Sequence, residues 1–221
     1  YKPPTISRIY STEGRIIDEF AKERRLFTPA EEIPVMIKQA FISAEDKNFY
    51  THPGYDIRGI AAAFRDAAVS RGRNVRGAST ITQQVMKNFL LDGSRRAERK
   101  IKEIILATRI EETLDKEQIL ELYVNRVFLG HRSYGFETAA QTYYGRSLNE
   151  LTLAEHAMLA GVPQAPSRNN PLSNPERSEI RRNWILGRML GLGMISREAH
   201  QEAIAAVDTA SFNGLKVEID A

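Results

Sequence analysis

The sequence predicts a mainly α-helical domain, and three features of the chain lead to this prediction. Apolar residues recur with the helical period of about 3.6 over most of its length. Several of these periodic segments begin with capping-box spacing, in which a capping residue is followed three positions later by Glu or Gln. With 221 residues, 42% of them hydrophobic, the chain can bury a sizeable core as a single domain over residues 1–221.

The N-terminal part predicts one hairpin and one helix. Residues 7–20 alternate polar and apolar side chains around a Glu-Gly turn, as a short β-hairpin does. Thr28 and Glu31 have capping-box spacing. Apolar residues then follow the helical period over residues 35–44, and Pro34 suits the first position of that helix.

Further helices are predicted along the rest of the chain. Capping-box spacing marks helix starts at Thr80, Asp115 and Thr152. A basic loop, residues 72–77, precedes the helix that starts at Thr80, and the single tryptophan, Trp184, is expected in the core. The predicted helices cover residues 56–72, 80–91, 95–114, 116–128, 134–143, 153–162 and 176–206, with the last segment divided at 191–193.

Composition excludes several classes of function. A net charge of +3 is too small to give the chain a strong positive electrostatic field that would attract nucleic acid. Basic residues nevertheless cluster at 65–76 and 95–102. The absence of cysteine excludes a thiol nucleophile, a disulfide scaffold and cysteine metal sites. No apolar run approaches the roughly 18 residues that span a bilayer. The chain starts at Tyr1 without a signal-peptide pattern and reads as part of a longer protein, which leaves room for an anchor upstream.

The stretch from Ile42 to Gly54 places two acids, Glu45 and Asp46, at the end of an apolar helix and then turns sharply. The C-terminal end of a helix carries partial negative charge, which disfavours a carboxylate there. The neighbours Phe41 and Phe49 would also keep water away. Both effects raise the pKa of a carboxyl group, which suits a general acid or base near neutral pH. The alternative is a helix-end acid paired with an arginine.

A second cluster of polar residues lies in GASTITQQVMKN, residues 77–88. At helical spacing Thr80, Gln83, Gln84 and Lys87 fall on one face, within about 100° of each other. A glycine-led loop that runs into a capped helix offers free backbone N–H groups, which suit an anion. The spacing is not that of a Walker loop. A polar face turned to solvent is the alternative.

A third cluster lies in RRAERKIKE, residues 95–103. Three cations around one acid form either a ladder of ion pairs or a grip on pyrophosphate, because arginine forks suit phosphate oxygens. The polar residues on one helix face are Arg96, Arg99, Lys100 and Glu103, and the opposite, apolar face carries Ile101, Ile104, Ile105 and Thr108.

The helix predicted at residues 56–72 has an apolar stripe of its own. This stripe either packs on the core or enters the surface of a membrane. It consists of Ile57, Ile60, Ala61, Phe64 and Ala68.

Other catalytic patterns are missing from the sequence. The four histidines have no ligand spacing such as HExxH, and there is no GxSxG. There is also no Ser-x-x-Lys, so the sequence does not support an acyl-serine peptidase or transpeptidase in this chain.

Five segments, taken in order, resemble the motifs of the family 51 peptidoglycan glycosyltransferases. These are the glycosyltransferase domains of class A penicillin-binding proteins and their monofunctional relatives. The segments are EDKNFYTHPG, GASTITQQVMKN, RKIKE, ILELYVNRVFLG and YGFETAAQTYYGRSLNELTLAEHAMLAGVPQAPSRNNP. The match runs from about Ile33 to Pro171, and the tail to about Ala206 is also similar to the family. Five motifs in order with matching spacing are highly specific.

The resemblance implies a mainly α, lysozyme-like globular head with a smaller membrane-facing lobe at about residues 55–78. It implies one glycosyltransferase domain over 1–221, with no transpeptidase domain in this chain. The implied reaction joins lipid II to a growing glycan strand with inversion and releases undecaprenyl pyrophosphate. The expected location is the periplasmic face of the bacterial inner membrane, at its outer leaflet. Inhibitors of the moenomycin type are expected to bind, and nucleic acid is not an expected partner.

Roles for individual residues also follow from the resemblance. Glu45 matches the general base that takes the proton of the acceptor hydroxyl. Glu103 matches a second catalytic residue near the leaving group, acting directly or through a divalent cation such as Mg²⁺ or Mn²⁺; no other cofactor and no protein metal site are implied. Arg99 and Lys100 would balance the charge on the pyrophosphate. The implied substrate-binding residues are Asp46, Phe49, His52, Ser79, Thr80, Gln84, Lys87, Arg99, Lys100 and Asn125, the last with a more structural role.

Two other functions compete with this interpretation. A lysozyme-like lytic enzyme would also use a glutamate, but it has no use for the cations of residues 95–103. A non-enzymatic module that binds glycan or nucleic acid would use the basic clusters and leave the surroundings of Glu45 unexplained.

Overall fold

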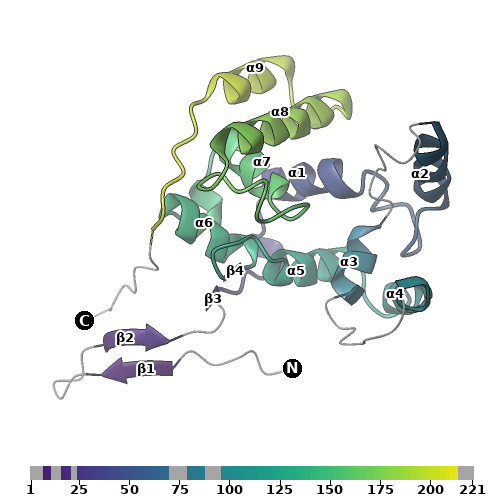
Figure 1. The fold of residues 1–221 in the computed structure, drawn as a ribbon, viewed down its shortest axis with the longest axis horizontal. Coiled ribbons are helices and arrows are strands. Elements are labelled where there is room, and N and C mark those ends of the chain that lie inside the picture. Colours follow the sequence, from purple (N-terminus) through teal and green to yellow (C-terminus); the bar gives the residue numbers. More distant parts are fainter. Residues whose placement is uncertain (1–6, 11–15, 21–23, 70–78, 88–95, 214–221) are drawn as a thin grey trace.

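The computed structural model describes residues 7–10, 16–20, 24–69, 79–87 and 96–213 of the chain (Figure 1). The side chains of some helix residues, among them Phe64 and Arg99, lie outside this description. Within it the fold is mainly α, as predicted. The helices are α1 Val35–Glu45, α2 Ile57–Val69, α3 Ile81–Lys87, α4 Arg96–Glu111, α5 Lys116–Arg126, α6 Phe136–Tyr144, α7 Leu153–Gly161, α8 Pro175–Gly191 and α9 Arg197–Ala205, with 3-10 turns η1 Ala30–Glu32 and η2 Leu148–Glu150.

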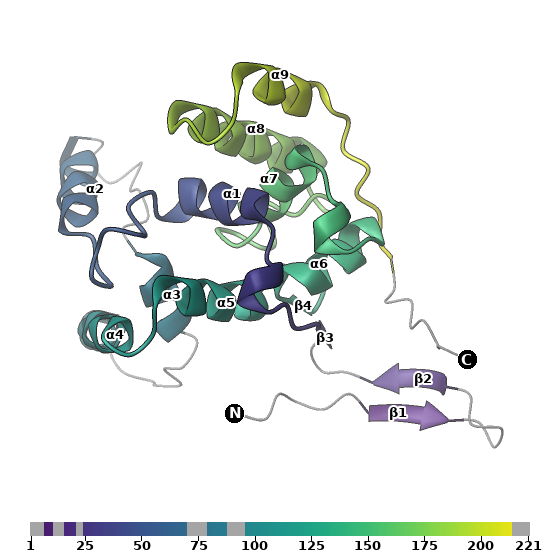
Figure 2. The ribbon, with the colours of Figure 1, turned by 180° about the vertical axis from the view of Figure 1, so that it is seen from behind.

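The helices pack in two groups around α1. Helix α7 packs against α1 and α8, and α8 also packs against α1 and α9. On the other side α3 packs between α4 and α5. Figures 1 and 2 show both groups from opposite sides, with α2 and α4 together at one edge of the molecule. Helix α1 therefore ends between the two groups.

The buried face of α1 explains why this helix is central. Ile37 and Phe41 are fully buried. The ring of Phe41 lies 5.0 Å from that of Tyr123 on α5 and 5.6 Å from that of Phe136 on α6. Aromatic pairs at these separations add to the free energy gained by apolar burial. The packing holds α1 firmly and so fixes the position of its last residue.

The predicted helix caps are confirmed in two cases and wrong in one. Asp115 and Thr152 each form a complete capping box at the start of α5 and α7. Thr80 caps α3 in part, because its hydroxyl accepts from the Gln83 amide. The box expected at Thr28 does not form: Pro29 precedes η1 without a side-chain cap. The amide of Thr28 donates instead to the side chain of Asn125.

Short strands tie the N-terminal part of the chain together. The predicted hairpin is confirmed, with β1 Ser7–Tyr10 antiparallel to β2 Ile16–Phe20. A parallel pair of two-residue strands was not predicted; it joins β3 Arg24–Arg25 to β4 Ser133–Tyr134. The Asn125 side chain then clamps the next segment, because its amide donates to the Thr28 carbonyl at 2.7 Å and its oxygen accepts from the Thr28 amide at 2.7 Å.

One expectation about side-chain burial is wrong, the one for Trp184. Trp184 is not in the core: 43% of it is exposed, and it lies between two arginines of α8. The isoleucine stripe on α4 also faces outward, with Ile101 and Ile105 exposed by 60% and 47%. The polar residue Glu103 is buried instead, because α4 turns that side of the helix toward α3.

Parts of the predicted lobe at 55–78 lie in the described residues. Helix α2 covers 57–69, whereas the basic loop at 72–77 and the end of the helix predicted at 80–91 lie outside the description. No helix in the described ranges is both long and apolar enough to cross a membrane.

Candidate active site

Glu45 is the last residue of α1, and helices from both groups hold its carboxylate. Oε2 accepts a hydrogen bond from the Gln84 amide of α3 at 3.2 Å. Oε1 lies 3.3 Å from Nη2 of Arg181 on α8. Burial is the largest effect on this carboxyl and raises the pKa of Glu45, while the charge of Arg181 and the hydrogen bond from Gln84 offset part of the rise. The result is a carboxylate that is more basic than usual and fixed at both oxygens.

Asp46 follows directly and has a different environment. Its side chain is buried, and Oδ2 accepts two hydrogen bonds: from Nε2 of His52 at 2.8 Å and from the Ile81 amide at 2.9 Å. The first bond closes the turn after α1, and the second attaches the start of α3. Asp46 therefore acts as a joint between these segments.

The turn after α1 is closed by His52, Gly54 and Thr80. His52 Nδ1 accepts from the Gly54 amide at 3.1 Å, so Nε2 carries the proton donated to Asp46. Gly54 has φ +90°, and a Cβ there would stand 2.6 Å from the carbonyl oxygen of Ala107. The Thr80 hydroxyl donates to the Gly54 carbonyl at 2.7 Å. The turn needs glycine because α4 passes so close to it.

Two amides at the start of α3 are engaged within the chain, in contrast to the expectation that they are free. The Ile81 amide donates to Asp46 and the Gln83 amide to Thr80. The anion at this helix start is therefore the chain's own Asp46 carboxylate. Thr80 is buried, and its hydroxyl is engaged both as donor and as acceptor. Its position supports a structural contribution.

Lys100 and Glu103 form a polar cluster with α3. The Lys100 ammonium lies 2.8 Å from Ser79 Oγ, 3.0 Å from Gln83 Oε1 and 3.3 Å from Glu103 Oε2. Glu103 is buried, whereas the Lys100 side chain is partly exposed. The ammonium is thus held in one place by three oxygens, with an open side toward solvent. Such an arrangement can stabilise negative charge that develops nearby.

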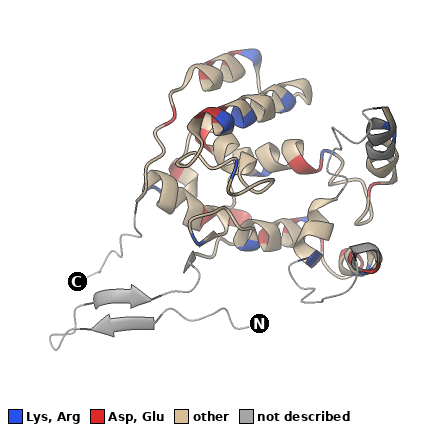
Figure 3. Ribbon diagram, viewed as in Figure 1, with Lys and Arg blue, Asp and Glu red and all other residues tan. Residues whose placement is uncertain are grey.

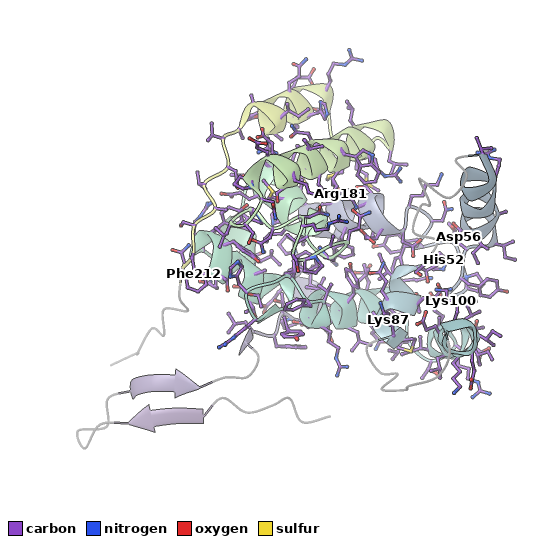
Figure 4. All side chains as sticks on the ribbon, viewed as in Figure 1. His52, Asp56, Lys87, Lys100, Arg181 and Phe212 are labelled. Carbon is purple, nitrogen blue, oxygen red and sulfur yellow. The ribbon has the colours of Figure 1, made fainter. Side chains whose placement is uncertain are left out.

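Adjacent glutamines link the two parts of the site. Gln84 contacts Glu45, and Gln83 contacts Lys100. A single turn of α3 therefore fixes a basic carboxylate relative to an anchored cation. Figure 4 shows Arg181 on the α8 side, with His52, Lys87 and Lys100 on the side of α3 and α4.

The remaining predicted site residues differ in their exposure and in their contacts. Lys87 is exposed at the end of α3. Phe49 is fully buried and packs its ring edge against His52, so it shapes the turn from inside. Asn125 holds the backbone at Thr28, which supports the structural role. The side chain of Arg99 lies outside the description.

Sequence reasoning missed Arg181 and the contact of Gln83 with Lys100. Arg181 follows Glu45 by 136 residues and lies outside the five motif segments. Its guanidinium stacks 4.2 Å from the centre of the Trp184 ring. Arginine and tryptophan three residues apart share a helix face, which is the one signal in the sequence that points to this pair.

The described part of the site has no ready set of protein ligands for a divalent cation. The described residues contain no cluster of three or more potential metal ligands. Magnesium is commonly held by one or two carboxylates together with substrate phosphates. A single carboxylate such as that of Glu103 is therefore compatible with a magnesium ion that arrives with the substrate. The Lys100 ammonium lies against that carboxylate, however, and supplies positive charge itself.

Charged residues are interspersed over the described helices. Figure 3 shows Lys and Arg positions interspersed with Asp and Glu positions along the described ribbon. This distribution agrees with a net charge of only +3 and does not favour a nucleic-acid surface.

Comparison with known proteins places the chain among transglycosylases. The family model described as Transglycosylase matches residues 13–190. Penicillin-binding protein 1A of Rickettsia prowazekii is 49% identical over 208 residues, which are 93% of this chain and 26% of the relative. Penicillin-binding protein 1A of Pseudomonas aeruginosa is 48% identical over 214 residues, or 97% of this chain and 26% of the relative.

A solved structure agrees with these matches. The crystal structure of penicillin-binding protein 1A from Haemophilus influenzae superposes with a TM-score of 0.58 and 31% sequence identity, covering 97% of this chain and 22% of that one. The fold is therefore the lysozyme-like transglycosylase fold that the motifs implied. The chain spans about a quarter of the length of the relatives it matches.

Proposed function

The chain belongs to the transglycosylase family, and from this premise we propose that it is a peptidoglycan glycosyltransferase that polymerises lipid II into glycan strands. The observation that carries the proposal is the single turn of α3 that holds Glu45 through Gln84 and Lys100 through Gln83. A glycosyl transfer that releases pyrophosphate needs a base on the acceptor side and positive charge on the leaving side. The site supplies both groups.

In the proposed reaction the 4-hydroxyl of the incoming unit's GlcNAc attacks the anomeric carbon of the growing strand. Glu45 takes the hydroxyl proton as the new C–O bond forms. The bond from the anomeric carbon to the pyrophosphate oxygen breaks, and its electron pair leaves with undecaprenyl pyrophosphate. Attack from the opposite side inverts the anomeric centre. No group has to protonate the leaving oxygen, because pyrophosphate leaves well when cations neutralise its charge.

Lys100 and Arg99 are proposed to neutralise that charge, and Glu103 to orient Lys100. Three oxygens hold the ammonium before substrate arrives, so little reorganisation is needed as charge develops. Ser79 belongs to the same cluster. A divalent cation beside Glu103 remains a prediction, and no step of this proposal depends on it.

The exposed edge of α2 and α4 is proposed to contact the outer leaflet of the bacterial inner membrane, on its periplasmic side. Both helices lie at one edge of the molecule (Figure 1), and both expose large apolar side chains: Ile57, Val69, Ile101 and Ile105. A substrate carried on a lipid has to be reached at the membrane surface. Apolar side chains that enter the headgroup region give an interfacial protein its affinity for lipid.

The first prediction concerns Glu45→Gln, which removes the base and keeps the size of the side chain. Turnover of lipid II should fall by about 10²–10⁴-fold, as is typical when a general base is lost. For the wild type, turnover should fall as the pH is lowered through the raised pKa of Glu45, because the protonated carboxyl cannot accept a proton. Gel analysis of polymerised glycan measures both effects.

The control for this variant is Glu202→Gln on the exposed part of α9, which should keep full activity. A folded Glu45→Gln protein with near-normal turnover would contradict the assignment. The same assay separates the rival functions: cleavage of existing strands would indicate a lytic enzyme, and binding without turnover would indicate a binding module.

The second prediction concerns Lys100→Ala. Turnover should fall by about 10²-fold or more, the scale observed when one preorganised charge-stabilising group is lost. Affinity for a phosphoglycolipid inhibitor of the moenomycin type should fall as well, because its phosphate would use the same ammonium. Glu103→Gln should also lower turnover, since it loosens Lys100.

Matched controls lie on the same helix. Lys102 pairs with Glu98 on α4, and its side chain is as exposed as that of Lys100. Lys102→Ala and Glu98→Gln should have almost no effect in either assay. If Lys100→Ala behaves like Lys102→Ala, the proposed role at the pyrophosphate is wrong.

The third prediction concerns the membrane. The double variant Ile101→Asp/Ile105→Asp should bind vesicles of phosphatidylglycerol and phosphatidylethanolamine about tenfold or more weakly than the wild type, because burying one such side chain contributes about 1.5–3 kcal/mol. Co-sedimentation measures the bound fraction. Ile180→Asp is the control, since Ile180 is 71% exposed but lies on α8. Equal binding by all three folded proteins would count against the proposed membrane edge.

A further inference from the structure

We propose that Arg181 of α8 is a positioning residue for the Glu45 base, holding the carboxylate ionised and correctly oriented. This role rests on the proposed function, in which Glu45 accepts the proton of the acceptor hydroxyl. Arg181 lies outside the five motif segments, so the proposal comes from the geometry of α8 and α1 alone.

Two donors hold the carboxylate of Glu45 in one orientation. Arg181 Nη2 lies 3.3 Å from Oε1 of Glu45, and the Gln84 amide lies 3.2 Å from Oε2. These two donors come from α8 and α3, on opposite sides of the end of α1. The plane of the carboxylate is thereby fixed, while each oxygen keeps a second lone pair that can accept a proton. A base must be held in this way if it is to meet the acceptor hydroxyl at hydrogen-bond distance.

The Arg181 guanidinium is itself held firmly by its neighbours on α8. It stacks 4.2 Å from the centre of the Trp184 ring, and the Arg188 guanidinium lies 5.1 Å from the same ring. Arg188 also donates from Nε to the carbonyl of Ser43, two residues before Glu45. The row Arg181–Trp184–Arg188 therefore attaches α8 to the C-terminal end of α1. This row accounts for the exposed tryptophan, whose ring serves the two arginines instead of the core.

The positive charge of Arg181 also affects the ionisation of Glu45. The end of α1 already carries the partial negative charge of its carbonyl groups, which makes an ionised Glu45 costly. Burial raises the pKa of Glu45, and the nearby positive charge of Arg181 offsets part of this rise. The other titratable groups that act on Glu45 are Asp46 and Tyr123; burial raises the pKa of Tyr123 well above its usual value, so that phenol stays neutral. Arg181 is therefore the charged group that favours the ionised form of the base, alongside the hydrogen bond from Gln84.

The test compares Arg181→Met and Arg181→Lys with the wild type and with Arg197→Met, a control at the exposed start of α9. Turnover of lipid II by Arg181→Met should fall most at pH values below the pKa of Glu45, by about tenfold there, because a rise of one unit in that pKa lowers the ratio of ionised to protonated carboxyl tenfold. The loss should shrink as the pH is raised, and KM for lipid II should stay close to that of the wild type. Arg181→Lys should recover part of the activity.

A second measurement does not depend on activity. Carboxyl-carbon NMR of protein labelled at glutamate can follow Glu45 directly, with the signal identified by its absence in Glu45→Gln. Its titration midpoint should move to higher pH in Arg181→Met and should not move in Arg197→Met. Trp184→Leu should move it in the same direction by a smaller amount, since the guanidinium then loses its support.

The two measurements separate the possible failures. If the wild type makes no polymer, the proposed function fails, and the NMR titration still decides whether Arg181 controls Glu45. An unchanged midpoint in a folded Arg181→Met protein would overturn the positioning role. A higher KM with an unchanged pH profile would overturn it too, because Arg181 would then bind substrate and not serve the base.

Discussion

The buried carboxylate of Asp46 is the interaction on which the site depends. One of its oxygens accepts from the ring of His52 and from the amide of Ile81. It thus joins the end of α1, the turn that follows and the start of α3. Hydrogen bonds to a charged group contribute about 1.5–3 kcal/mol each, and leaving a partner unsatisfied in the interior costs a similar amount. Because α3 then carries Gln84 to Glu45 and Gln83 to Lys100, Asp46 determines where both reactive groups lie.

The two neighbouring acids at the end of α1 have different roles because their side chains lie in different surroundings. Asp46 faces inward, where hydrogen bonds from His52 and Ile81 compensate its charge. Glu45 is partly buried between α3 and α8, and this burial raises its pKa although Arg181 partly opposes the rise. A carboxylate that is costly to ionise but held in its ionised form is a strong proton acceptor. The same turn of chain therefore supplies the joint and the base.

Helices and caps could be predicted because they depend on local sequence. Asp115 and Thr152 cap their helices through residues only three positions away. The contact of Arg181 with Glu45 joins residues 136 positions apart, and no local pattern determines it. The helical period of the sequence predicts the apolar stripe of α4, but it does not show whether another element packs on that stripe. In the structure Ile101 and Ile105 of this stripe are exposed. The roles of site residues came from the resemblance, while their hydrogen-bond partners had to come from the structure.

Amide hydrogen exchange at Ile81 in Asp46→Ala shows whether Asp46 joins these segments, with Asp115→Ala as the control for loss of an aspartate at a helix start. If Asp46 is the joint, protection of the Ile81 and Gly54 amides should fall by about tenfold or more, the equivalent of one lost hydrogen bond to a charged group, while amides in α7 and α8 keep their protection. Asp115→Ala should leave both amides unchanged. Wild-type protection of Ile81 in a folded Asp46→Ala protein would contradict the account.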